Sequence, residues 1–292
     1  MIRSLDPIPA PAGHAPGGNG RTLVDAHAHI HDCFDLGAFL DSAAANFAAA
    51  SGGADARGVL LLTEGEGEDR FTELAGRARA RRDGVGVPDA AAEWTFETTL
   101  EEHALLARKG ARTLVLVGGR QVATSDGLEV LVFGTRERFL DGRPLLDVLG
   151  RARAMERPHA IPWGAGKWLF RRGRMLSGIL ASGPGSDFSL GDESGRPLFW
   201  PRVRHFEEAR RRGIRVLRGT DPLPFVDEVA RAGSFGFAID GAIDLGRPMG
   251  WLETALRDPR VRLHDYGRLE SPVPFVVHQW GMQRRKRARG RN

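Results

Sequence analysis

The sequence is poor in cysteine: its 292 residues include one, Cys33. A single cysteine excludes a disulfide within the chain and predicts a protein of the reducing cytoplasm. No nearby residue offers Cys33 a partner, so we expect it to be a small buried side chain.

Long apolar runs are also missing. No stretch of about 18 apolar residues occurs, and this predicts that the chain has no membrane span. Residues 1–20 are rich in Pro, Gly and Ala and lack the apolar core of a signal peptide, so we expect a disordered leader there. The composition is 41% hydrophobic and 27% charged, without an internal repeat, and it predicts one globular domain over residues 21–280.

Outside the C-terminus the chain carries almost no net charge. The formal net charge is +5, but residues 284–292 hold six Lys and Arg, which leaves 5 − 6 = −1 for the rest. We therefore treat residues 281–292 as a basic tail. A solvated chain end is the simplest interpretation, and contact with nucleic acid or anionic lipid is the alternative. The near-neutral body disfavours nucleic acid as a partner.

Short apolar runs alternate with amphipathic segments along the chain. Strands are expected over residues 22–30, 58–63, 93–99, 113–118, 128–133 and 216–218, and helices over 36–50, 71–82, 100–109, 144–156, 206–212 and 223–232. This alternation predicts an α/β protein with a parallel sheet, closed at this length into a distorted TIM-like barrel of seven or eight β/α units. The glycine-rich stretch 177–201 lacks periodicity and is expected to be a long loop.

The first predicted strand carries the sequence Asp25-Ala26-His27-Ala28-His29. In a regular strand Asp25, His27 and His29 share one face, and two imidazoles so placed can hold one cation. A buried, hydrogen-bonded pair of histidines and an exposed edge strand are the alternatives. His31 continues the alternation, although the following residues indicate a turn.

Asp-x-His-x-His in this place resembles the first motif of the PHP (polymerase and histidinol phosphatase) family, and it is also similar to the first strand of amidohydrolases. Four later segments favour PHP, in the family's order: Leu62-Thr63-Glu64-Gly65, Gly127-Leu128-Glu129-Val130, Ala160-Ile161-Pro162 and Gly219-Thr220-Asp221-Pro222-Leu223. The resemblance covers roughly residues 22–225. It implies a PHP-type, metal-dependent hydrolase barrel.

The departures from the family pattern are as informative as the matches. Family histidines are replaced at Gly65, Ile161 and Leu223, and His159 could replace one of them only at a different depth. The ligands that the resemblance leaves are His27, His29, Glu129 and Asp221, with Glu64 as a fifth. Such a set suits one Zn, Mn or Fe ion and does not reproduce a trinuclear centre.

One bound cation would activate water, and the resemblance then favours a phosphoesterase in which Asp221 and Glu129 take part in catalysis. Asp221 before a proline also suits the N-cap of a helix. For the substrate, Trp163, Lys167 and Arg171 follow a predicted strand and offer an aromatic face and cations for a phosphorylated or otherwise anionic small molecule. A packed turn is the alternative for that segment.

Two further functions stay open. The three missing histidines favour a catalytically inactive, PHP-like binding or regulatory protein. An amidohydrolase that cleaves C–N bonds is the other possibility, but it predicts further histidine ligands on the middle strands, and we find no convincing pair there.

Overall fold

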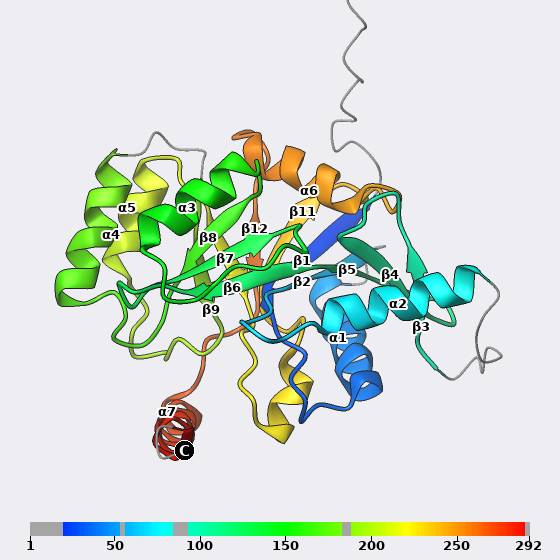
Figure 1. Ribbon diagram of the computed structural model, residues 1–292, viewed down its shortest axis with the longest axis horizontal. Helices are drawn as coiled ribbons and strands as arrows, with labels where there is room; N and C mark the ends of the chain where they lie inside the picture. The colour runs from blue at the N-terminus through cyan, green and yellow to red at the C-terminus, as the bar shows by residue number, and fades with distance from the viewer. Residues whose placement is uncertain (1–19, 53–55, 84–92, 183–187, 290–292) are drawn as a thin grey trace, which may run out of the picture.

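A computed structural model describes residues 20–52, 56–83, 93–182 and 188–289 of the chain. Two mixed sheets form its centre (Figure 1). The larger has seven strands, in the order β12 (His264–Tyr266), β11 (Gly236–Asp240), β1 (Arg21–Ala28), β2 (Ala56–Leu62), β5 (Arg112–Val117), β4 (Ala104–Lys109) and β3 (Thr95–Thr98). The smaller has five, in the order β10 (Val216–Gly219), β9 (Ser189–Glu193), β8 (His159–Pro162), β7 (Glu129–Phe133) and β6 (Gly119–Ala123).

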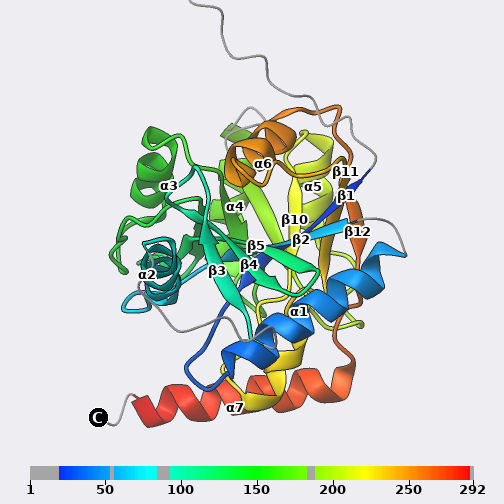
Figure 2. The same ribbon diagram turned by 90° about the vertical axis from the view of Figure 1, so that its right-hand side faces the viewer.

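Helices cover the outer side of each sheet (Figures 1 and 2). The larger sheet carries α1 (Leu36–Ser51) and α2 (Arg70–Arg82), and the smaller carries α3 (Leu145–Ala154), α4 (Phe170–Ser182) and α5 (Arg204–Arg211). The remaining elements are a 3₁₀ helix η1 (Val226–Arg231), α6 (Pro248–Arg257) and α7 (Pro272–Arg289). Capping residues mark both ends of α1. The carboxylate of Asp35 accepts from the backbone N–H of Ala38 at 2.7 Å, and Gly52 ends the helix.

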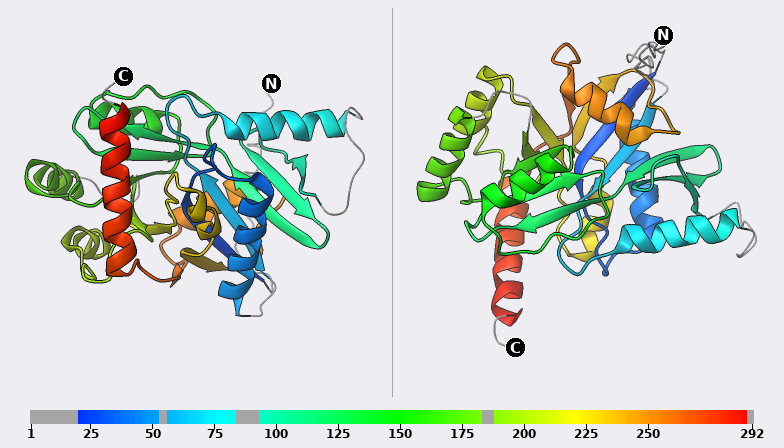
Figure 3. Two further views of the ribbon diagram at one scale, coloured as in Figure 1. Left: turned by 90° about the horizontal axis from the view of Figure 1, so that it is seen from below. Right: turned by 45° about the horizontal axis from the view of Figure 1, so that its top comes forward.

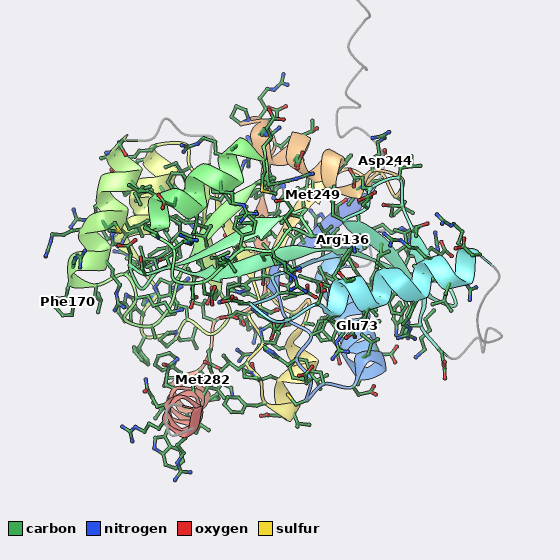
Figure 4. All side chains as sticks on the ribbon, in the orientation of Figure 1. Glu73, Arg136, Phe170, Asp244, Met249 and Met282 are labelled. Carbon is green, nitrogen blue, oxygen red and sulfur yellow. The ribbon has the colours of Figure 1, made fainter. Side chains whose placement is uncertain are left out.

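Three hydrophobic cores match this layering. Alternate residues of the larger sheet face α1 and α2, as Leu60 does, or face the other sheet, as Val59 and Leu61 do. The smaller sheet divides its residues in the same way between the inner core and α3–α5. Helix α6 contributes Met249, which is fully buried, to the core between the sheets (Figure 4). The four layers are therefore helix, sheet, sheet and helix.

The predicted TIM-like barrel is wrong: the strands form two separate mixed sheets, neither of which closes. Five strands, β3 to β7, follow one another without a helix between them, and β3–β4, β4–β5, β6–β7 and β7–β8 are antiparallel pairs. The predicted helix over residues 100–109 is β4, whose first four residues are all buried. Gly110, at φ 56°, then forms the tight turn from β4 to β5, since few other residues tolerate that conformation.

Several other expectations need correction. The stretch 177–201 is not one loop: α4 extends to Ser182 and β9 begins at Ser189, with residues 183–187 outside the described part. The predicted helix 223–232 is the short 3₁₀ helix η1, and Cys33 is exposed rather than buried. Most of the expected leader, residues 1–19, lies outside the described residues.

The two sheets come close together where β10 passes β1. A Cβ atom built on Gly219 would lie 2.3 Å from the backbone N and 2.5 Å from the Cβ of His27, so only glycine fits there. The carboxyl ends of β1 and β10 are thereby brought together, and the chain leaves β10 directly beside the histidines of β1.

Helix α7 contains residues 281–289 of the expected basic tail, and residues 290–292 lie outside the described part. It runs along one edge of the molecule, below both sheets in Figure 2, and Figure 3 shows it at full length from below. Within the described residues, no helix combines the length and the apolar character needed to cross a membrane.

Candidate metal centre

Three side chains meet at the carboxyl ends of β1 and β10: His27, His29 and Asp221. The two Nε2 atoms lie 3.0 Å apart, and Oδ1 of Asp221 lies 3.4 Å from Nε2 of His27 and 3.5 Å from Nε2 of His29. A tetrahedral zinc site with bonds of about 2.1 Å places its ligand atoms about 3.4 Å apart. The donor set of two imidazoles and one carboxylate, and its spacing, therefore fit one cation.

An irregularity in β1 sets the direction of these side chains. The pairing of β1 with β2 shifts between Asp25 and Ala28, so the alternation of faces does not continue regularly through this segment. Asp25 consequently does not share the site. Its carboxylate accepts from the backbone N–H groups of Thr220 and Gly233 at 2.8 and 2.9 Å. The expected single face of Asp25, His27 and His29 is wrong for Asp25.

Asp221 owes its position to an unusual backbone conformation. Its φ of 45° is left-handed, which is uncommon for a residue with a side chain and tends to mark functional sites. Its N–H donates to the carbonyl oxygen of His27 at 2.7 Å, which ties the segment after β10 to β1. Asp221 is not the N-cap of a helix, because η1 starts five residues later, at Val226.

Neighbouring polar groups orient the imidazoles. Nδ1 of His27 lies 3.0 Å from Oε1 of Glu193, and Nε2 of His27 lies 3.0 Å from Oε1 of Gln121. A carboxylate on the far nitrogen of a histidine fixes its tautomer and presents the other nitrogen to a metal. Nδ1 of His29 is buried without a hydrogen-bond partner in the described part of the chain, with Oε2 of Glu68 at 4.0 Å. That oxygen of Glu68 instead accepts from the backbone N–H of Gly65 at 2.8 Å.

The charges in this cluster depend strongly on one another. Burial disfavours the cationic form of His27, but Asp221 and Glu193 outweigh it and raise its pKa to about 10. Burial, together with the charge of His27, lowers the pKa of His29 to about 4. Despite burial, His27 and His29 lower the pKa of Asp221 to about 2, whereas burial and the charge of Asp221 raise that of Glu193 well above its usual value. At neutral pH the cluster without a cation thus contains one charged and one neutral imidazole.

The structure does not bring Glu64 and Glu129 into the three-atom cluster. Glu64 accepts from the N–H of Phe71 at 2.6 Å and from Arg120 at 3.2 Å. Glu129 forms an ion pair with Lys167. Burial opposes the charge of Lys167, but Glu129, and beyond it Glu193 and Asp221, raise its pKa, so Lys167 lies within the electrostatic reach of the site.

The other expected substrate residues take different places. Trp163 is a core residue, 4% exposed, and packs edge-to-face on Trp200. Arg171 is exposed in the first turn of α4. His159 starts β8, where its Nδ1 contacts the carbonyl oxygen of Arg157, and it is not part of the cluster. Nε2 of His31 contacts the carbonyl oxygen of Pro222 at 2.8 Å and does not belong to the cluster.

Sequence reasoning missed Glu193 and Gln121, two further residues that contact His27. Glu193 falls in the glycine-rich stretch that was expected to be a loop, although Ser189 to Glu193 form a strand. Gln121 follows two glycines that indicate a turn, yet Gly119 already begins β6. Neither strand was predicted, because short strands between glycines show no clear alternation of apolar and polar residues.

Replacing Glu193 by alanine is expected to weaken cation binding about 10–100-fold, since His27 loses the group that orients it. Glutamine should restore affinity to within a few-fold. An amide at this position can still accept from His27 and donate to Asp221, the two groups that Glu193 contacts. Competition with a metal-binding dye measures both variants, and Glu207→Ala, at an exposed position of α5, is the control. Wild-type affinity in Glu193→Ala would contradict this role.

Comparison with known proteins gives information about the fold only. No family model matches the sequence, and no curated protein matches it either. Among solved structures, the chain is similar to that of PsfC from Pseudomonas syringae PB-5123, with a TM-score of 0.52, 15% sequence identity, and coverage of 90% of this chain and 98% of that chain. At this identity the likeness supports a shared chain fold and leaves the resemblance to PHP proteins a prediction.

Proposed function

We propose that the chain is a metal-dependent hydrolase with a single-ion site, acting on a phosphoester. The observation that carries the proposal is the convergence of Nε2 of His27, Nε2 of His29 and Oδ1 of Asp221 at the spacing of cation ligands. Three protein ligands with a fourth position left open are typical of catalytic sites, whereas structural zinc sites use four protein ligands.

A bound cation would lower the pKa of a water molecule and polarise the group under attack. The chain's own residues supply the rest. Glu193 holds His27 in the required tautomer, and the backbone bond from Asp221 to His27 fixes the distance between the two ligand-bearing segments. Asp221, as an ionised carboxylate at neutral pH, can also accept a proton.

Positive charge near the site supports an anionic substrate. Glu129, Glu193 and Asp221 raise the pKa of Lys167, and the side chain of Lys167 remains 31% exposed. A cavity of about 100 Å³ adjoins the cluster through Gln121 and Glu68. Its walls hold Arg120 and Arg138 but also Glu64 and Glu66, so Lys167 is the cation that supports an anionic substrate. A cavity of this size suits a small group such as a phosphate rather than a large ligand.

The test combines metal content with a substrate panel. Protein purified without chelator and without a polyhistidine tag should contain about one equivalent of a transition metal and should hydrolyse a p-nitrophenyl phosphoester. The same protein should leave the corresponding anilide and acetate unchanged. Absence of metal, with none taken up from added Zn²⁺ or Mn²⁺, would refute the proposal, and cleavage of the anilide alone would favour an amidohydrolase.

A non-catalytic binding protein is the second candidate. The ion pairs of Glu64 with Arg120 and of Glu129 with Lys167 favour it, because they occupy two carboxylates that the family resemblance assigns to metal ions. This candidate predicts that the metal-loaded protein binds the phosphoester without turning it over. Calorimetric titration beside the activity assay separates the two functions.

A further inference from the structure

Helix α7 exposes a stripe of apolar side chains along its first half. Val273, Val276, Val277 and Trp280 follow the i, i+3, i+4, i+7 spacing of one helix face, and their exposed fractions are 74%, 61%, 58% and 58%. Large exposed apolar groups usually occur singly, so four on one face indicate a binding surface. We refer to these four residues as the α7 stripe.

A second apolar contact of α7 lies on the side of the helix that faces the body. Phe199, 60% exposed, lies edge-to-face on Phe275 of α7 with ring centres 5.7 Å apart, and Leu198 beside it is 52% exposed. The segment before α7 is tied to the same region by the hydrogen bond from the N–H of Leu198 to the carbonyl oxygen of Glu270 at 2.8 Å. These contacts attach α7 to a segment that is far from it in sequence.

The second half of α7 is strongly basic. Arg284 and Arg287 are exposed, and the sequence adds Arg285, Lys286 and Arg289. No acidic residue occurs anywhere in α7. Arg284 lies over the ring of Trp280, 3.6 Å from its centre, at the junction of the apolar and basic halves. Helix α7 thus carries apolar groups and a tryptophan in its first half and a block of cations in its second half.

Packing on the body orients the helix. The ring of His278 stacks on Phe225 with centres 6.0 Å apart, and its Nδ1 lies 2.8 Å from Oε1 of Glu270. Gly281 also faces Phe225, since a Cβ there would lie 2.8 Å from that ring. These contacts use a different side of α7 from the stripe, which leaves the stripe pointing away from the protein. Met282 marks the helix at the lower edge of the molecule (Figure 4).

We propose that α7 is a docking surface for an anionic lipid bilayer. The α7 stripe would enter the boundary between head groups and acyl chains, with Trp280 at that boundary, and the basic half would lie on the anionic head groups. Apolar burial and charge attraction would act together, which is the combination that holds a peripheral helix on a membrane. This proposal is independent of the metal centre.

Two other occupants fit less well. A second copy of the chain would place another α7 against this one, and since α7 contains no acid, its five cations would find no partner on the opposing helix. Nucleic acid would contact the cations but offers nothing to the valines of the α7 stripe. A surface that is anionic outside and apolar beneath satisfies the charge and the apolar groups together.

The experiment uses flotation of the full chain with vesicles. Wild-type protein should bind vesicles containing about one-third phosphatidylglycerol and not vesicles of phosphatidylcholine alone, and raising the salt concentration should weaken the binding. Arg284→Glu/Arg287→Glu should weaken it at least about 20-fold, given a factor of about five for each cation near an anionic surface. Val277→Ser/Trp280→Ser should weaken it at least about tenfold.

The matched control is Arg79→Glu/Arg174→Glu, which makes the same charge change at exposed positions of α2 and α4 and should bind as the wild type does. Four results would overturn the proposal: no vesicle binding by the wild type, equal loss in the control, unchanged binding in Val277→Ser/Trp280→Ser, or a dimer that this double variant dissociates in the absence of lipid. Size-exclusion chromatography and circular dichroism establish that each variant is folded. Metal content should be equal in all of them, so failure here leaves the hydrolase proposal standing.

Discussion

Replacing His29 by alanine is expected to weaken binding of a divalent cation by more than about 100-fold, because this removes a ligand atom and not only a group that orients one. His29 is the better histidine to change. Its lowered pKa of about 4 makes it neutral at pH 7, so its loss leaves no buried charge without a partner. Loss of His27, whose pKa is about 10, would remove the positive imidazole that pairs with Asp221 and would leave that carboxylate without this partner. A drop in cation binding would then reflect unfolding as well as the missing ligand.

His31→Ala is the matched control for that variant. His31 is the next histidine of the same alternation, and its ring stacks on that of His29 with centres 5.2 Å apart. Its Nε2 nevertheless faces the carbonyl oxygen of Pro222 and not the three-atom cluster. The control should therefore keep cation affinity to within about tenfold. Titration with a competing dye and elemental analysis measure both variants, and equal losses in the two would contradict the assignment of ligands.

All six predicted strands overlap a strand of the structure, whereas the predicted helices include an error of type. The segment 36–50 was predicted as a helix and forms α1, since Asp35 caps it and apolar residues recur at helical spacing. The segment 100–109 was predicted as a helix and contains β4, which is buried on both faces and so has no period of two. A continuous apolar run of this length does not distinguish a buried strand from a helix. That single error favoured repeated β/α units, and with them a barrel.

Proximity in the site followed from chain order only in part. His27 and His29 were predicted to act together because they are two residues apart, and Asp221 was expected beside them because its segment resembles a late PHP motif. Glu193 could not be placed in this way, since its contact with His27 spans 166 positions and depends on how β9 lies beside β10. Asp25 illustrates the reverse case. It belongs to the same motif as the histidines, yet the irregularity in β1 turns it toward Thr220 and Gly233.

Asp25 is therefore expected to act on stability rather than on cation binding. Its buried carboxylate accepts four hydrogen bonds: from the N–H groups of His27, Thr220 and Gly233, and from the hydroxyl of Thr220 at 2.5 Å. Asp25→Ala would leave these donors buried without an acceptor and should lower the free energy of unfolding by roughly 3–5 kcal/mol. Asp35→Ala, which removes one exposed cap bond from α1, should cost only about 1 kcal/mol.

Asp25→Asn gives this role a signature in pH that a simple packing defect would lack. Burial raises the pKa of Asp25 from 3.8 to about 6, so the folded state favours the protonated carboxyl. The resulting stability is fully present below the unfolded pKa and is lost as the pH rises through the folded one. Between about pH 4 and about pH 7 the wild type should lose roughly 2 kcal/mol relative to Asp25→Asn, which does not titrate. Urea unfolding of both proteins at the two pH values measures this difference, and parallel pH dependence would show that Asp25 is already ionised in the folded protein at about pH 4.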